Sequence, residues 1–164
     1  AIARKLTFLL ITAVYSTSIY SYQNHGSTWT GTCSSGLKQS PISITEASAT
    51  TIAESSDAFK KLNLDYNEKE VKGNQVEDTL RFTAEWGELE VDGESDFEWT
   101  ATHFDIRSRG EHLINGNYCD LEMQIFHSRS SETNRILALA VCFTNEDNDN
   151  NEFIEDLIAA INEQ

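Results

Sequence analysis

Six segments with the alternating pattern of β-strands follow one another along the chain, and they constrain its fold more than any other feature. They are Lys61–Tyr66, Asp78–Ala84, Gly87–Val91, Ala101–Arg107, Tyr118–His127 and Arg135–Thr144. Turn signals such as Asp92-Gly93 and Asn115-Gly116 separate several of them, which favours antiparallel neighbours. One clear helix is predicted at Asn151–Ile161, where apolar residues recur at helical spacing. We therefore expect a mainly β domain with minor helix.

Chain length and charge narrow the classes of function. The 164 residues suit one domain with its own core. The net charge of −15, from 27 acidic and 12 basic residues, opposes binding to phosphate backbones and anionic lipid heads. We therefore predict no nucleic-acid partner.

The first residues have the pattern of a secretion signal. Arg4 and Lys5 precede the apolar run Leu6–Tyr15, and small residues follow at cleavage-type spacing. The run is too short for a comfortable membrane span, so we expect none. We predict a signal peptide at residues 1–18, a secreted domain at residues 19–164, and, as the alternative for the leader, a buried N-terminal strand or helix.

An acidic stretch, Asn145–Glu152, precedes the predicted helix. A calcium loop of the EF-hand type needs a central glycine and regularly spaced oxygen ligands, and this stretch has neither. A solvated turn is the favoured interpretation, with calcium binding as the alternative.

Three cysteines cannot all pair within one molecule. Cys142 lies in an apolar run and is expected to be a small buried hydrophobe, whereas Cys33 lies in a loop rich in glycine and serine that suits a disulfide. Cys119 and Cys142 lie on predicted strands, and Cys33 lies outside them. A disulfide between any two of them would need Cα atoms within about 7 Å and converging Cβ vectors, and we do not expect this geometry. We expect three free thiols in residues 1–164.

Two predicted strands carry the candidate site. Alternation places His103 and Asp105 on one face of Ala101–Arg107. On Tyr118–His127, Glu122 and Gln124 likewise share a face. If these strands are neighbours in the sheet, Gln124 can face the first pair.

Ordered motifs extend this pattern over most of the chain. They are Gln39-Ser40-Pro41-Ile42, Thr102-His103-Phe104-Asp105, Glu111–Gly116, Leu121–His127, Ile136-Leu137-Ala138 and Asn151-Glu152-Phe153. In order and spacing they resemble the α-carbonic anhydrase family from Tyr22 to the C-terminus. The resemblance implies a central twisted, mostly antiparallel sheet, of which this chain is the N-terminal portion, truncated at its C-terminus.

The family binds a catalytic zinc ion through three histidines, and the resemblance puts His103, Asp105 and Gln124 at those positions. A carboxylate can bind zinc, but a neutral amide is a weak ligand, so we expect no zinc or weakly bound zinc. Glu122 matches the carboxylate that orients the third ligand. Glu111 matches the one that holds a gatekeeping threonine, which would lie beyond residue 164. The family's proton-shuttle histidine has no counterpart.

Further expectations follow from the resemblance. Cys33 would pair with a cysteine beyond residue 164, and the same segment would supply further strands, so residues 1–164 should expose an apolar edge and be poorly stable alone. His112 and His127 also match family motifs, and we interpret them as structural hydrogen-bonding residues. Asp105→His with Gln124→His is expected to restore zinc binding before turnover.

Three hypotheses for function remain open. The first is a secreted carbonic-anhydrase-like domain without hydratase activity, acting as a binding module for an unknown extracellular protein. The alternative is an active or metal-variant zinc carbonic anhydrase that interconverts carbon dioxide and bicarbonate. The third is a fragment of a divergent gene that makes no stable protein. Zinc content separates the first two.

Overall fold

The computed structural model describes residues 24, 27–38, 40–50, 53, 55–57, 60–76, 79–92, 98–129, 132–145 and 150–162. The predicted signal peptide at residues 1–18 lies outside this part of the chain, as do Gln39 of the first motif and Asp78. In chain order the elements are α1 (Thr32–Ser35), β1 (Ser43–Ile44), β2 (Leu62–Tyr66), β3 (Gly73–Val76), β4 (Thr79–Thr83), β5 (Gly87–Val91), β6 (Trp99–Arg107), β7 (Leu113–Ile114), β8 (Asn117–Tyr118), β9 (Leu121–Arg129), β10 (Glu132–Phe143) and α2 (Glu152–Asn162).

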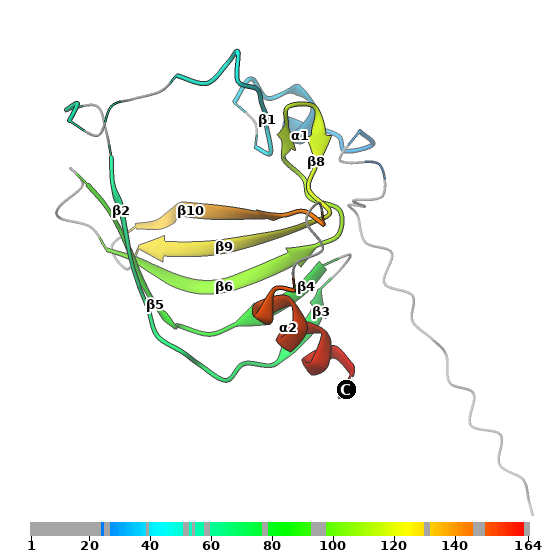
Figure 1. The fold of residues 1–164 in the computed structure, drawn as a ribbon. Coiled ribbons are helices and arrows are strands. Elements are labelled where there is room, and N and C mark those ends of the chain that lie inside the picture. The colour runs from blue at the N-terminus through cyan, green and yellow to red at the C-terminus, as the bar shows by residue number, and fades with distance from the viewer. Residues whose placement is uncertain are drawn as a thin grey trace, which may run out of the picture.

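The main sheet confirms the predicted mainly β architecture. Within the described residues its order is β10-β9-β6-β4-β3, and β5 pairs with both β6 and β2. Every pairing in this sheet is antiparallel. Figure 1 shows the long strands β6, β9 and β10 side by side, with β2 crossing them at one end.

One predicted strand is divided in the structure. The segment predicted as Tyr118–His127 forms β8, then a bend at Cys119 and Asp120, then β9. β8 belongs to a short hairpin with β7, closed by Asn115 and Gly116 at φ 49° and 84°. Positive φ at both positions is what a two-residue hairpin turn requires, and an Asn-Gly pair supplies it at low cost.

The hairpin anchors the N-terminal arm, defined here as residues 27–38 and 40–50. Strand β1 of the arm pairs in parallel with β7, joining Ser43 to Leu113 and Ile44 to Ile114. Figure 1 shows α1, β1 and the hairpin gathered at one end of the molecule, away from α2. The alternation pattern did not predict β1, β3 or β7, which have four residues or fewer.

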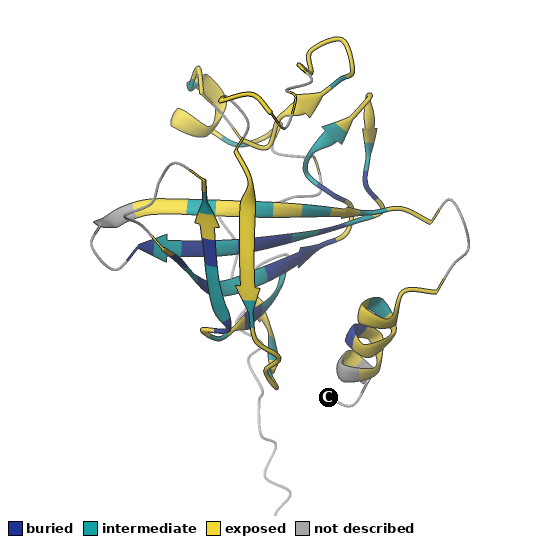
Figure 2. Cartoon of the chain, turned by 60° about the vertical axis from the view of Figure 1, so that its left-hand side comes forward, coloured by how far each residue is buried: buried dark blue, intermediate teal, exposed yellow. Residues whose placement is uncertain are grey.

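The core lies on one face of the sheet. Phe82 and Ile106 pack with Leu157 of α2, and Trp86 and Ala101 pack with Ile125. The Asn151 side chain accepts a hydrogen bond from the Ile154 amide at 3.3 Å, which caps the predicted helix. Figure 2 shows burial concentrated on β6 and β9, while β2 is exposed along most of its length.

Strand β10 forms an edge of the described sheet. Its residues from Ile136 to Phe143 alternate between exposed and half-buried, and Ile136 is 71% exposed. An edge strand of this kind offers unpaired backbone groups beside apolar side chains. The apolar edge expected from the sequence is therefore present, whereas the low stability of the chain stays a prediction.

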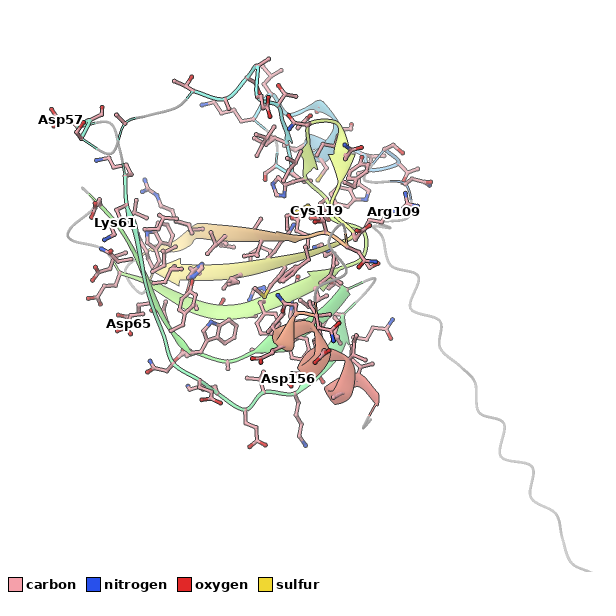
Figure 3. All side chains as sticks on the ribbon, viewed as in Figure 1. Asp57, Lys61, Asp65, Arg109, Cys119 and Asp156 are labelled. Carbon is pink, nitrogen blue, oxygen red and sulfur yellow. A yellow bond between two sulfur atoms is a disulfide. The ribbon has the colours of Figure 1, made fainter. Side chains whose placement is uncertain are left out.

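The prediction of three free thiols is wrong, because Cys119 and Cys142 form a disulfide with Cα atoms 5.5 Å apart. Cys142 lies opposite Glu122 in the β9–β10 pair, and the Asp120 amide bonds to the Phe143 carbonyl at 3.1 Å. The bend before β9 thus carries Cys119 next to Cys142. Figure 3 places Cys119 at the end of the sheet nearest the β7–β8 hairpin.

The other cysteine predictions have different outcomes. Cys142 is exposed rather than the small buried hydrophobe expected, because alternation along β10 turns its position away from the core. Cys33 is an exposed free thiol in this structure. Its pairing with a cysteine beyond residue 164 stays a prediction.

Candidate functional site

Strands β6 and β9 bring the three ligand positions of the sequence analysis onto one face. In their antiparallel register Asp105 lies opposite Gln124, and His103 lies opposite Phe126. Residues opposite each other in such a pair point to the same face, as do residues two apart on one strand. The same register adds Arg107, which lies opposite Glu122.

The Asp105 carboxylate is fully buried and holds two guanidinium groups. Arg81, on the neighbouring strand β4, donates from Nε to Oδ1 at 2.7 Å and from Nη2 to Oδ2 at 2.8 Å. Arg107 donates from Nη2 to Oδ2 at 3.3 Å. Paired contacts between one guanidinium and one carboxylate are among the strongest in proteins. Asp105 is therefore the anionic partner of Arg81 and Arg107 in an internal ion-pair network.

Gln124 joins the same cluster through both ends of its amide. Its Oε1 accepts a hydrogen bond from Arg107 Nε at 3.2 Å. Its Nε2 donates to Glu111 Oε2 and to Glu122 Oε1, each at 2.7 Å. The neighbours fix the orientation of the amide, because its nitrogen faces the carboxylates and its oxygen faces the guanidinium. Gln124 thus bridges groups of opposite charge.

Glu122 receives hydrogen bonds from the loop after β6. Its Oε2 accepts from the amides of Glu111 and His112 at 2.8 and 2.9 Å, and its Oε1 accepts from His112 Nδ1 at 2.8 Å. Burial alone would raise the pKa of Glu122, but hydrogen bonds from Gln124, His112 and the two amides lower it below its ordinary value. A carboxylate held in this way stays ionised.

His103 stands at the margin of the cluster. Its ring stacks on Phe126 at 4.7 Å between centroids, and its Nδ1 lies 3.0 Å from the Thr102 hydroxyl. That hydroxyl donates its one proton to the Phe126 carbonyl at 3.1 Å, so it accepts the proton of Nδ1. Burial, with the charge of Arg81, lowers the pKa of His103 and favours the neutral ring.

The two histidines predicted to be structural both have hydrogen-bond partners. His112 bonds to Glu122 and lies 3.4 Å from the Ser40 hydroxyl of the arm. His127 is fully buried, with Nδ1 3.2 Å from the Leu137 carbonyl and Nε2 2.6 Å from the Tyr66 hydroxyl. Burial lowers the pKa of His127. A neutral ring satisfies both contacts, because Nδ1 can donate while Nε2 accepts.

The donor set does not fit a zinc ion. Catalytic zinc in this kind of site takes three protein ligands and leaves one position open. Here the three positions carry one imidazole, one carboxylate already bonded to two guanidinium groups, and one amide bonded on both sides. Across the part of the chain that the structure describes, no group of three or more His, Cys, Asp or Glu side chains could hold a metal.

Sequence analysis missed the two arginines of this cluster. Arg107 could have been found, because alternation from His103 and Asp105 places it next on the same face. Arg81 could not, since its contact with Asp105 depends on the register of β4 against β6. Glu111 and Glu122, by contrast, were identified from the sequence, and both lie within hydrogen-bond distance of Gln124.

A separate cavity of about 210 Å³ opens on the other face of the sheet. Trp86, Phe104 and Phe153 line it, with Lys69 as its charged residue. The sheet separates this cavity from the charged cluster, because Phe104 alternates with His103 and Asp105 along β6. The charged cluster consists of Arg81, Asp105, Arg107, Glu111, Glu122 and Gln124.

Comparison with known proteins decides the family. A profile of the eukaryotic-type carbonic anhydrases matches residues 23–164. The chain belongs to this family. No curated protein sequence matches it. The carbonic-anhydrase-like chain spans about half the length of the solved structures that it resembles.

Three solved structures illustrate the likeness. The α-carbonic anhydrase of Photobacterium profundum is 25% identical, with a TM-score of 0.61 over 78% of this chain and 54% of its own. A halotolerant carbonic anhydrase of Dunaliella salina is 18% identical, with a TM-score of 0.69 over 90% and 63%. Dioscorin complexed with ascorbate is 21% identical, with a TM-score of 0.58 over 69% and 44%. The last two comparisons establish the shared fold.

Among the described residues, no helix is both long and apolar enough to span a membrane.

Proposed function

We propose that this chain is a carbonic-anhydrase-like domain that does not hydrate carbon dioxide and instead acts as a binding module for an extracellular partner. One observation carries the first part of the proposal. The Asp105 carboxylate and the Gln124 amide oxygen, at two of the three ligand positions, already accept hydrogen bonds from Arg107.

The chemistry of hydration explains why this observation matters. The family's reaction needs a metal ion that lowers the pKa of a bound water to near neutrality. Lone pairs that accept guanidinium protons are not free to bind a metal, and the nearby positive charges of Arg81 and Arg107 oppose its approach. His103 alone is a poor zinc site.

Two features support a binding role. The fold also occurs in dioscorin, whose structure contains ascorbate, so by analogy a carbonic-anhydrase fold can serve ligand binding. The cavity behind the sheet, lined by Trp86, Phe104 and Phe153, has the mostly apolar lining of a ligand pocket, and its volume of about 210 Å³ suits a ligand smaller than those that fill pockets of roughly 300–1,000 Å³.

The proposal of secretion rests on two independent features. Residues 1–18 have the charged and apolar pattern of a signal peptide. The Cys119–Cys142 disulfide is typical of proteins that fold in an oxidising compartment.

Zinc content and hydration rate together test the first part of the proposal, the loss of hydration activity. The chain is purified after growth in zinc, dialysed without chelator and assayed by plasma emission spectroscopy and stopped-flow carbon dioxide hydration. We expect substoichiometric zinc and a rate equal to that of buffer. Stoichiometric zinc with a hydration rate that acetazolamide abolishes would show instead an active, metal-variant carbonic anhydrase.

A further inference from the structure

The two guanidinium groups are positioned by the sheet itself. Arg81 lies directly opposite Asp105 in the β4–β6 pair, and Arg107 lies directly opposite Glu122 in the β6–β9 pair. The Arg107 side chain is only 10% exposed, whereas that of Arg81 is 34% exposed. Arg107 lies on a strand that is paired on both sides, and its side chain is buried. It is therefore held in place more firmly than an arginine in a surface ion pair.

Arg107 contacts three acidic or amide groups at once. It reaches Asp105 at 3.3 Å through Nη2, and Gln124 and Glu111 through Nε at 3.2 and 3.4 Å. Two of these three groups stand at ligand positions of the family's metal site. The third, Glu111, matches its threonine-orienting carboxylate.

We propose that Arg107, supported by Arg81, takes the structural place of a metal ion in this sheet. It is an internal cation that holds Asp105, Gln124 and Glu111 together and excludes divalent metals. This inference rests on the proposed function, because a native chain that bound zinc tightly would contradict both.

An arginine at this position changes the expected effect of restoring the histidines. From the sequence alone, Asp105→His with Gln124→His is expected to restore zinc binding. In the structure these two imidazoles would lie against the Arg107 guanidinium, with no carboxylate left at position 105 to balance it. Like charge and lost space both oppose a zinc ion there. Tight zinc binding therefore also requires the removal of Arg107.

Cobalt(II) is the probe, because its visible absorption reports coordination without any need for turnover. Four chains are compared by cobalt titration, with zinc calorimetry as a second measurement: the native chain, the Asp105→His/Gln124→His variant, the same variant with Arg107→Ala, and the same variant with Arg109→Ala. Arg109 is exposed and two residues away, so its removal is a control for the change in net charge.

The expected order of affinity separates the two proposals. The native chain binds no cobalt, the two-histidine variant binds it weakly, and Arg107→Ala improves that binding at least about tenfold, whereas Arg109→Ala does not. Equal affinity with and without Arg107 would overturn the inference while leaving the proposed function intact. Tight cobalt or zinc binding by the native chain would overturn both.

Thermal unfolding tests the inference if the triple variant does not fold. Arg107→Met and Arg109→Met are compared by thermal unfolding, each in chelator and in excess zinc. We expect a lower midpoint for Arg107→Met alone and no effect of zinc on the native chain. Equal midpoints for the two variants would show that Arg107 does not hold the cluster together.

Discussion

Asp105→Asn should lower the free energy of unfolding by about 3 kcal/mol, although it changes the side chain by a single atom. Asp105 is fully buried and accepts three guanidinium hydrogen bonds, two from Arg81 and one from Arg107. Asparagine keeps the shape of the side chain but loses its charge. Its amide nitrogen is itself a donor, so it cannot accept the hydrogen bonds that the guanidinium groups offer. The change leaves positive charge in the sheet without its main counter-ion.

The magnitude follows from the exposure of the two arginines. Removing one partner of a buried ion pair costs about 3–5 kcal/mol. Arg81, with its side chain 34% exposed, can turn to water, which reduces the cost. Arg107 cannot do so as readily, but it keeps Glu111 at 3.4 Å. Both effects favour the lower end of the range.

Urea unfolding followed by circular dichroism measures the change. The matched control is Asp57→Asn, the same substitution at an exposed position, which should stay within about 0.5 kcal/mol of the native chain. Adding Arg107→Met to Asp105→Asn should cost less than the two single changes together, because neither charge is then left alone. A loss below about 1 kcal/mol for Asp105→Asn would refute the ion-pair reasoning.

Three further predictions use other parts of the molecule. Burial lowers the pKa of His127 from its ordinary value of 6.5, so on acidification the unfolded chain takes up this proton before the folded chain does, and stability should fall as the pH falls below 6.5. Urea midpoints should therefore decrease across this range, and they should decrease less steeply in His127→Asn. Reducing the Cys119–Cys142 disulfide, with partners 23 residues apart, should cost about 3 kcal/mol, and denatured chains should show one thiol before reduction and three after. Gly110→Ala should cost about 2 kcal/mol in urea unfolding, because its Cβ would lie 2.9 Å from the Cβ of Cys119 and 3.0 Å from Glu122 Oε2; an unchanged midpoint would mean that the loop yields freely.

The sheet was predictable because its determinants are local. The alternation along Ala101–Arg107 and Tyr118–His127 is enough to place Phe104 and Ile125 in the core and Asp105, Glu122 and Gln124 on the other face. The helix cap at Asn151 is likewise a property of adjacent residues. What alternation cannot supply is which strands pair and in what register.

Two of the missed features depend on that register. The contact between Arg81 and Asp105 joins residues on β4 and β6, and the disulfide joins the bend before β9 to the end of β10. A signal for the disulfide did exist, since Cys119 and Cys142 are about equally far in sequence from the midpoint between β9 and β10. Arg107 needs no register, because alternation along its own strand is enough to place it beside Asp105.

The parallel pairing of β1 with β7 has a consequence for local stability. The arm is held to the rest of the chain by contacts at exposed residues, among them the β1–β7 bonds and a bond of 3.1 Å from the Glu46 amide to the Asn115 side chain. Such contacts lie at the weak end of a protein's range of opening free energies. The arm should therefore detach and reattach many times before the sheet unfolds once. Amide hydrogens of Ser43 and Ile44 should exchange with solvent far faster than those of β6 and β9, and a protease should cut the arm while the sheet stays folded.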